Sequence, residues 1–311
     1  MTAGLALDLL LVGMVLTVAA WTLLARRAFV AFVAFAVFGL LLAMAWVRLG
    51  AIDVALTEAP VGVLTSVLLL AAASRLRDLG SHTVEPSVPL RIAVALLCMF
   101  IASTLAATVL LLPDPAPSLA TAAAAGLPAT GLGNPVTAVL MAYRAIDTLM
   151  EKVVLVVGLL AVWSLAADGL WDGRPAAASA ADPDGALAFL ARILPPVGLV
   201  VAVYVFWVSA DEPGGAFQGG AILAAMLLLA IMAGLIDTPA LGGRRLRLAL
   251  VGGALVFFAV GLGGLVFGQG FLTYPAAFAK PLILLIEAAL IVSIALSLAL
   301  FVAGPAERPR R

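Results

Sequence analysis

The sequence contains long runs of apolar residues that are each long enough to cross a lipid bilayer. A single helical crossing needs about 20 apolar residues, and only helices or closed barrels satisfy their backbone hydrogen bonds in lipid. The apolar residues here are continuous instead of alternating with polar ones, which indicates helices. We therefore predict an all-α, polytopic membrane protein with about nine transmembrane helices. The predicted spans are 5–24, 28–47, 58–76, 91–112, 148–167, 194–210, 216–236, 248–268 and 281–303.

The composition excludes several other classes of protein. Of 311 residues, 65% are hydrophobic and 11% are charged, whereas a typical soluble domain is about 25% charged. So little charge cannot cover a water-facing surface, which excludes a soluble enzyme, and 17 basic against 17 acidic residues leave no positive excess for a nucleic acid. With one cysteine, Cys98, and one histidine, His82, we expect no disulfide framework and no metal site. No nucleophile–base pair or cofactor motif is visible, so we expect neither catalytic residues nor a cofactor.

The basic residues predict the orientation, because Lys and Arg concentrate in cytoplasmic loops. Most of the basic residues fall in alternate connections and in the C-terminal tail, whereas the remaining connections hold only Arg48, Arg144 and Lys280. We therefore predict an outside N-terminus, a cytoplasmic C-terminus and, since no basic residue precedes the first span, no cleavable signal. The basic residues in alternate connections and the tail are Arg26, Arg27, Arg75, Arg77, Arg91, Arg174, Arg192, Arg244, Arg245, Arg247, Arg308, Arg310 and Arg311.

Two changes in composition divide the chain. Residues 113–134 are rich in Pro, Ala and Gly, which predicts a long external loop. Residues 168–186 combine acids, Gly, Pro and small residues, which predicts a linker. We assign 1–167 to a five-helix part, 168–192 to the linker and 193–311 to a four-helix part.

A few charged residues lie in or beside the predicted spans. A charge at the bilayer centre costs at least about 2.5–3.5 kcal/mol on insertion scales, so it is retained mainly where it faces protein or water. In DVALTEAP, Thr57 can cap a helix in which Glu58 complements the positive end and Pro60 lies in the first turn. Alternatively, Glu58 is a proton carrier at the entrance of a proton pathway. Asp53 is five residues away, about 140° around a regular helix, so the two acids share a face only if the backbone is irregular.

The next charged group comes at the start of the fifth predicted span. The apolar stretch from Val153 to Ala167 is too short to cross a bilayer, so the helix must draw Glu151 and Lys152 into the membrane or its interface. Arg144, Asp147 and Glu151 fall on one helical stripe. Such a stripe can pass a proton or hold a cation, and the alternative is an interfacial ion pair with Lys152 extending to the surface.

The motif DEPGGAFQGG begins the seventh predicted span. Pro213 beside Gly214 and Gly215 suits a helix start, and Gly219 and Gly220 permit close helix packing. We favour packing over backbone approach to an ion, and Gln218 must find an internal partner.

Glu287 lies six residues after Pro281 in the last predicted span, about 9 Å along the helix. No interfacial role suits this position, so Glu287 needs a neighbour such as Gln269, Lys280 or a cation of another subunit, or it is protonated. Ser293 and Ser297 can extend a polar stripe along the same helix. All the predicted acids fall in the outer half, which suits entry or exit of cations.

Three blocks of this sequence resemble parts of Mrp-type multisubunit cation/proton antiporters. PGGAFQGGAILAA at 213–225 is similar to a signature of their B subunit, and the similarity continues through GFLTYPAAF and the acid of the last span. DVALTEAPVG at 53–62 and NPVTAVLMAYRAIDTLMEKVVL at 134–155 resemble blocks of the C-terminal region of their large A subunit. The same pieces occur as small subunits of membrane-bound hydrogenases. Two positions depart from the pattern, namely the residues Ser209 to Glu212 before the Pro-Gly-Gly motif and Lys152 in place of an apolar residue.

The resemblance implies an accessory subunit that lies in the bacterial cytoplasmic membrane. Together with other antiporter subunits, this subunit is expected to exchange Na⁺ (or another monovalent cation) for H⁺. It places Asp53, Glu58, Asp147 and Glu151 at the family's acidic positions. A membrane-arm subunit of a hydrogenase or other complex-I-like assembly is an alternative, as is a purely structural subunit. A self-contained transporter would show an internal inverted repeat, and none is visible.

Overall fold

The computed structural model describes residues 3–78, 87–113, 115, 117–166, 169–175, 185–268 and 270–307. His82, Gln269 and the arginines at 308–311 lie outside these residues. Within them the protein is helical and forms no strand, only one isolated bridge between Pro175 and Ala306, so the predicted all-α fold is confirmed. The helices are α1 (Ala3–Leu24), α2 (Ala28–Arg48), α3 (Ile52–Asp78), α4 (Val88–Leu110), α5 (Ala120–Thr130), α6 (Pro135–Ala138), α7 (Ala145–Trp163), α8 (Ala186–Val208), α9 (Ala216–Met232), α10 (Arg244–Phe267) and α11 (Ala279–Ala303), with a π-helical turn at Val139–Tyr143 and a 3-10 turn at Ala276–Phe278.

Seven helical segments of the described residues are long and apolar enough to cross a membrane. They comprise α1, α2, α3, α4, α8, α10 and the segment Ala276–Ala303 that contains α11. The other two predicted spans also form helices, but α9 has 17 residues and α7 has 19, with Asp147, Glu151 and Lys152 among them. The predicted membrane character is therefore supported, while the count of nine and the orientation stay predictions.

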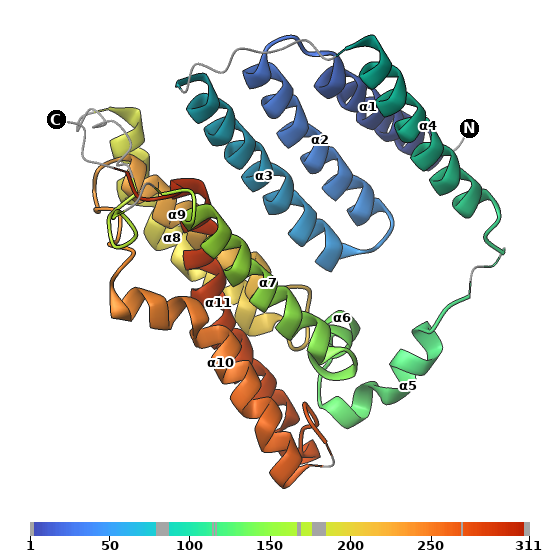
Figure 1. The fold of residues 1–311 in the computed structure, drawn as a ribbon. Helices are drawn as coiled ribbons and strands as arrows, with labels where there is room; N and C mark the ends of the chain where they lie inside the picture. Colours follow the sequence, from blue (N-terminus) through green and yellow to red (C-terminus); the bar gives the residue numbers. More distant parts are fainter. Residues whose placement is uncertain are drawn as a thin grey trace.

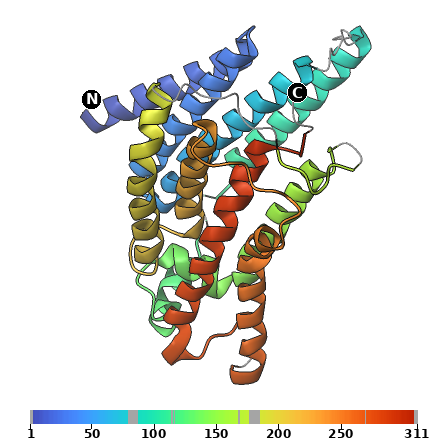
Figure 2. The same ribbon diagram turned by 90° about the vertical axis from the view of Figure 1, so that its left-hand side faces the viewer.

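The helices form two groups (Figures 1 and 2). In the first group α2 packs along both α1 and α3, and α4 contacts the other helices only sparsely. In the second group α11 packs against α9 and α10, and α8 packs against α9. Helix α7 lies against α10 and α11, and a few contacts join α3 to α9 and α11. The space where α3 meets α7, α9 and α11 is therefore the junction of the two groups.

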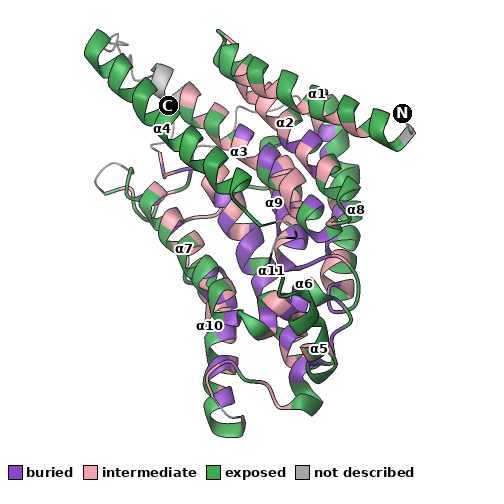
Figure 3. Cartoon of the chain, turned by 90° about the vertical axis from the view of Figure 1, so that its right-hand side faces the viewer, coloured by how far each residue is buried: buried purple, intermediate pink, exposed green. Residues whose placement is uncertain are grey.

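The buried core lies around α11 (Figure 3). Ile283, Ile286 and Phe257 are completely buried there, together with Ala202 of α8. The three hydrophobic clusters of the described residues draw on residues from position 127 onward. The second group thus has a core of its own, and α11 is its central element.

Two local predictions are wrong. Residues 113–134 include the helix α5, because its run of alanines has the highest helix propensity of any residue type. Leu132 and Asn134 from the same segment are buried, so the segment contributes to the interior. Thr57 is not a helix cap, because α3 begins at Ile52 and carries Thr57 and Pro60 inside it.

Of the predicted linker, 168–192, the structure describes residues 169–175 and 185–192. Residues 186–192 form the start of α8, and residues 169–175 are tied to the second helix group. Arg247 pairs with Asp172 at 2.8 Å, and Leu241 N donates to Gly173 O at 2.9 Å. Glu307 N donates to Arg174 O at 3.1 Å. Residues 176–184 of the predicted linker lie outside the described residues, and the predicted division into two parts stays a prediction.

Candidate ion-binding cavity

A cavity of about 540 Å³ lies between α3, the α6–α7 region, α9 and α11. Its walls are mostly apolar, but it collects titratable side chains from three distant parts of the chain. Asp53 comes from α3, Glu151 and Lys152 from α7, and Glu287 from α11. The remaining polar or motif residues of the lining are Thr57, Thr137, Thr148, Gly214, Gly215 and Gln218.

Asp53 joins α3 to two loops of the other helix group. Its Oδ1 accepts hydrogen bonds from Asn134 Nδ2 at 3.2 Å and from Gly214 N at 3.0 Å. Asn134 Nδ2 also lies 2.9 Å from Glu212 O, and its Oδ1 caps α6 by accepting from Val136 N at 2.8 Å. Asp53 is 9% exposed, so these bonds are made in the interior, where a carboxylate without donors would be costly.

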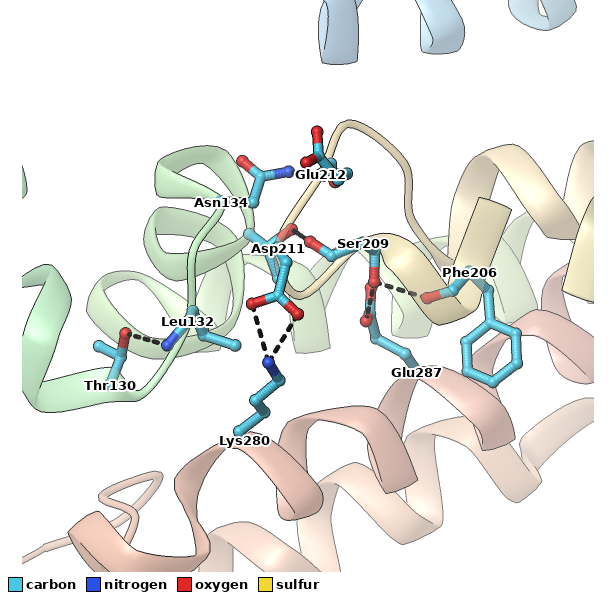
Figure 4. A network of polar contacts seen from close by, with 10 residues as sticks. Thr130, Leu132, Asn134, Phe206, Ser209, Asp211, Glu212, Lys280 and Glu287 are labelled. Atoms are coloured by element: carbon cyan, nitrogen blue, oxygen red, sulfur yellow. Dashed lines mark hydrogen bonds and ion pairs between the residues drawn. The ribbon is translucent and has the colours of Figure 1, made fainter. Parts of the chain in front are cut away.

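Glu287 reaches from α11 to the end of α8 and the start of α9 (Figure 4). Its Oε2 lies 2.5 Å from Ser209 Oγ, and its Oε1 accepts from Ala216 N at 3.4 Å. Ser209 Oγ also lies 2.7 Å from Phe206 O. Because a hydroxyl has one proton, Ser209 can serve both neighbours only when Glu287 is protonated and donates to it. When Glu287 is ionised, Ser209 must turn its proton to the carboxylate.

The glycines of the PGGAFQGG motif have two different roles. Gly214 presents its N–H to Asp53, and a side chain there would collide with the carbonyl oxygen of Val205. Gly215 is the N-cap of α9, and the N–H of the next residue, Ala216, donates to Glu287 at the positive end of the helix, which favours negative charge there. Gly219 and Gly220 lie outside the cavity lining, where an added Cβ would come within 2.7 Å of Ile291 and Ile294 of α11. The motif therefore combines close packing with backbone approach to carboxylates.

Gln218 and Thr57 connect α9 to α3 on the cavity wall. Gln218 Nε2 donates to Thr57 Oγ1 at 3.0 Å, and Thr57 Oγ1 donates to Asp53 O at 3.1 Å. The internal partner that the sequence required for Gln218 is thus a hydroxyl of the other helix group.

The two charged neighbours on α7 differ in their surroundings. Glu151 is exposed in the isolated chain and has no hydrogen bond or ion pair within the described residues. Lys152 is 3% exposed, and its Nζ donates to Ser297 Oγ of α11 at 3.0 Å. Ser293 and Ser297 are both completely buried, but neither lines the cavity and Ser293 Oγ donates to Leu250 O of α10, so the stripe extending from Glu287 stays a prediction.

Several predicted site residues lie elsewhere. Arg144 and Asp147 pair at 2.6 Å on the surface, because Arg144 follows the π-helical turn and does not continue the stripe of α7. Glu58 is half-buried on another side of the regular helix α3, without a hydrogen bond within the described residues. Lys280 does not contact Glu287, because it binds both oxygens of Asp211, at 2.6 and 2.8 Å (Figure 4).

A smaller pocket of about 230 Å³ shares Asp53, Val54 and Val136 with the cavity. It is lined by the α2–α3 turn and by Asn134, Asp211 and Pro213. Asp53 therefore stands between the two spaces. By the predicted topology, the smaller pocket is on the outer side.

Sequence reasoning missed Asn134, Thr137 and Ser209. Thr137 Oγ1 donates to Ser209 O at 2.7 Å, and Gly133 N and Asn134 N both donate to Ala210 O, at 2.8 and 3.1 Å. Placing an uncharged residue in the bilayer costs less free energy than placing a charged one, so these residues did not stand out in the sequence. The Asn-Pro pair at 134–135, which is typical of a helix start, was the one available signal.

Comparison with known protein families identifies two domains. Residues 186–306 match a domain related to the MnhB subunit of Na⁺/H⁺ antiporter. Residues 13–78 match MbhD, a family named for one of the subunits of MBH. The resemblance inferred from the motifs is thereby confirmed for these segments. No curated protein sequence matches the chain.

Two solved structures resemble the fold. A chain of the Mrp complex from Dietzia sp. DQ12-45-1b superimposes with a TM-score of 0.74 and 25% identity over 97% of this chain. This chain spans only 35% of that chain. A chain of the membrane-bound sulfane sulfur reductase, an archaeal respiratory membrane complex, gives a TM-score of 0.54 and 24% identity over 69% of this chain and 97% of that chain. The second similarity concerns the fold alone.

Proposed function

We propose that this chain, which joins an MbhD domain to an MnhB-related domain, is an accessory membrane subunit of a multisubunit monovalent cation/proton antiporter. Its partners are other antiporter subunits, the exchanged ions are Na⁺ and H⁺, and its place is the bacterial cytoplasmic membrane. The chain is a transport subunit and not an enzyme. The similarity to an Mrp complex chain over 97% of this chain supports the assignment.

One observation carries the transport role. Asp53, Glu151, Lys152 and Glu287 are far apart in the sequence and line a single cavity. Intramembrane ionisable residues are retained mainly where they face one another or an ion pathway. If these four side chains faced lipid, nothing would bring them from three helices into one cavity.

The geometry suggests how the cavity acts. The smaller pocket beside Asp53 gives the cavity an entrance from the predicted outer side. When Glu287 is protonated, it can donate a hydrogen bond to Ser209 Oγ. When it has released the proton, its carboxylate can accept from both Ser209 Oγ and Ala216 N. A cation and a proton thus compete for the same set of carboxylates, and the path continues into partner subunits.

Replacement of Glu287 by Gln tests this role in the intact complex reconstituted in proteoliposomes. We expect E287Q to reduce Na⁺-driven proton movement at least about tenfold, in the range found when a positioned proton-transfer group is lost. Asp237→Asn is the control, because Asp237 is 91% exposed and lies far from the cavity lining. The measurement is the rate of ΔpH dissipation on Na⁺ addition. Normal antiport by an assembled E287Q complex would leave the chain a purely structural role.

A redox-linked assembly is the second candidate. It is favoured by the MbhD domain and by the fold shared with the sulfane sulfur reductase chain. Purification of the native complex in mild detergent distinguishes the two. An antiporter co-purifies with membrane subunits alone, whereas stoichiometric iron or nickel in the complex would establish the redox-linked assembly.

A further inference from the structure

Lys152 is a buried cation that faces the cavity without an acidic partner. Its side chain is 3% exposed, and no carboxylate of the described residues lies within 4.0 Å of its nitrogen. A buried ammonium is costly unless it is paired or faces water. The cavity supplies that opening, since Lys152 is one of the residues that line it.

The hydroxyl groups around Lys152 are oriented to accept from it. Ser297 Oγ donates to Ser293 O at 2.7 Å, which leaves its lone pairs for Lys152 Nζ at 3.0 Å. Ser293 Oγ in turn donates to Leu250 O of α10. The ammonium is therefore held in a fixed position by α11 and has donors to spare for the cavity.

An apolar seal follows Lys152 in the direction of the predicted cytoplasmic side. Leu159 and Trp163 come about two and three turns after Lys152 along α7, and Leu300 follows Ser297 on α11. These three residues belong to one buried hydrophobic cluster, in which Trp163 Nε1 finds no hydrogen-bond partner among the residues that the structure describes. Lys152 thus marks the inner end of the polar lining within the described residues.

Two of the three carboxylates that line the cavity, those of Asp53 and Glu287, lie toward its other end, whereas Glu151 directly precedes Lys152 on α7. Ser297, which binds Lys152, is ten residues beyond Glu287 on α11, or about 15 Å along the helix axis. Asp53 and Glu287 are both held by the start of α9, through Gly214 N and Ala216 N. A metal cation at these carboxylates is repelled by the fixed ammonium, and it is repelled more strongly as it moves inward.

We infer that Lys152 determines the ion specificity of the cavity by excluding alkali cations from its inner end, so that only protons reach that end. This inference rests on the proposed transport function. A proton can pass where Na⁺ cannot, because the amine and the hydroxyl groups can exchange protons without accommodating a second metal-sized cation. The alkali cation is then confined to the Asp53 and Glu287 end.

The test compares Lys152→Met with Lys152→Arg in the purified complex, using ²²Na⁺ as the probe. Met keeps the length and apolar character of the stem, whereas Arg keeps the charge. For K152M we expect the concentration of Na⁺ that half-saturates binding to fall about sixfold, as expected for loss of a unit charge about 15 Å away at an effective dielectric constant near 20. K152R should retain the affinity of the natural protein.

An unchanged Na⁺ affinity in an assembled K152M complex would overturn the inference. Loss of antiport in both K152M and K152R, with Na⁺ affinity unchanged, would also overturn it, because Arg keeps the charge but does not release its proton, and Lys152 would then be a proton relay. Size-exclusion chromatography shows whether each variant assembles. A further control, Ser297→Ala, keeps the charge of Lys152 and should keep the Na⁺ affinity within about twofold. The binding assay needs no transport, so absence of Na⁺/H⁺ exchange would count against the proposed function and not against this inference.

Discussion

The two helix groups bury their residues to very different extents. In α11, 61% of the most apolar stretch is buried, whereas α4 buries none of its residues and α1 almost none. Both groups have similar apolar sequences, so hydrophobicity alone does not separate them. Helices α2, α3 and α8 each bury 17% of that stretch, so the contrast rests on α11 and the helices packed against it, whereas α1 and α4 present most of their surface to lipid or to other subunits.

The same contrast appears in the glycines. Gly219, Gly220 and Gly253 of the second group fit closely against α11, whereas Gly13 of α1 has no atom within 4 Å of an added Cβ. The exception in the first group is the crossing of α2 and α3, where Gly39 and Gly62 meet backbone to backbone. Close packing therefore occurs at particular glycines of each group, whereas Gly13 of α1 and Gly252 and Gly263 of α10 face open space.

The largest effect is expected for Gly220→Val. An added Cβ would lie 2.7 Å from Ile294 Cγ2 and 3.2 Å from Ile291 O, both on α11. Overpacking of this kind costs about 1–3 kcal/mol and more where backbone must move. The thermal unfolding midpoint of the purified protein in detergent should fall markedly or assembly should fail. Gly252→Val is the matched control on α10, because nothing lies within 4 Å of its Cβ. Equal stability of the two variants would show that the second group is not the rigid core.

A smaller effect is expected for Asp53→Asn, which tests the connection between the two groups. The amide keeps the size of the side chain but loses the charge that strengthens the bonds from Asn134 and Gly214 N. A hydrogen bond to a charged group is worth about 1.5–3 kcal/mol and one to a neutral group about 0.5–1.5 kcal/mol, so each bond weakens by about 1 kcal/mol. Hydrogen exchange at Gly214 should accelerate while that of α10 is unchanged. Glu58→Gln on the same helix is the control for loss of a carboxylate that has no hydrogen bond within the described residues. Identical exchange in both variants would contradict the role of Asp53.

The smallest effect is expected for Gly62→Val. The new Cβ would lie 2.9 Å from Gly39 Cα, so α2 and α3 must move apart. Because lipid tails are as apolar as the helix faces they replace, separation costs only about 1 kcal/mol. Thermal unfolding followed by tryptophan fluorescence should show a small shift, and Gly13→Val should show none. A loss of stability as large as that of G220V would mean that the first group also has a rigid core.

The charges in the membrane helices were the most useful sequence signal for the site. Asp53, Glu151, Lys152 and Glu287 stood out because each is costly in lipid, and all four line the cavity. The same criterion also selected Arg144 and Asp147, which form a surface pair beyond a π-helical turn that the sequence did not reveal. It overlooked Ser209 and Asn134, since an uncharged residue becomes important only through the partner that it meets.

The sequence by itself determined the helices, because apolar runs in lipid have almost no other way to satisfy their backbone. It also determined where the chain packs closely, because only glycine allows the approach seen at Gly220. The tertiary structure decided which carboxylates share a space, which hydroxyl faces Glu287, and that Lys280 binds Asp211 instead. These contacts join residues more than 60 positions apart, and no local pattern of residues encodes the rotation and tilt that bring two helices together.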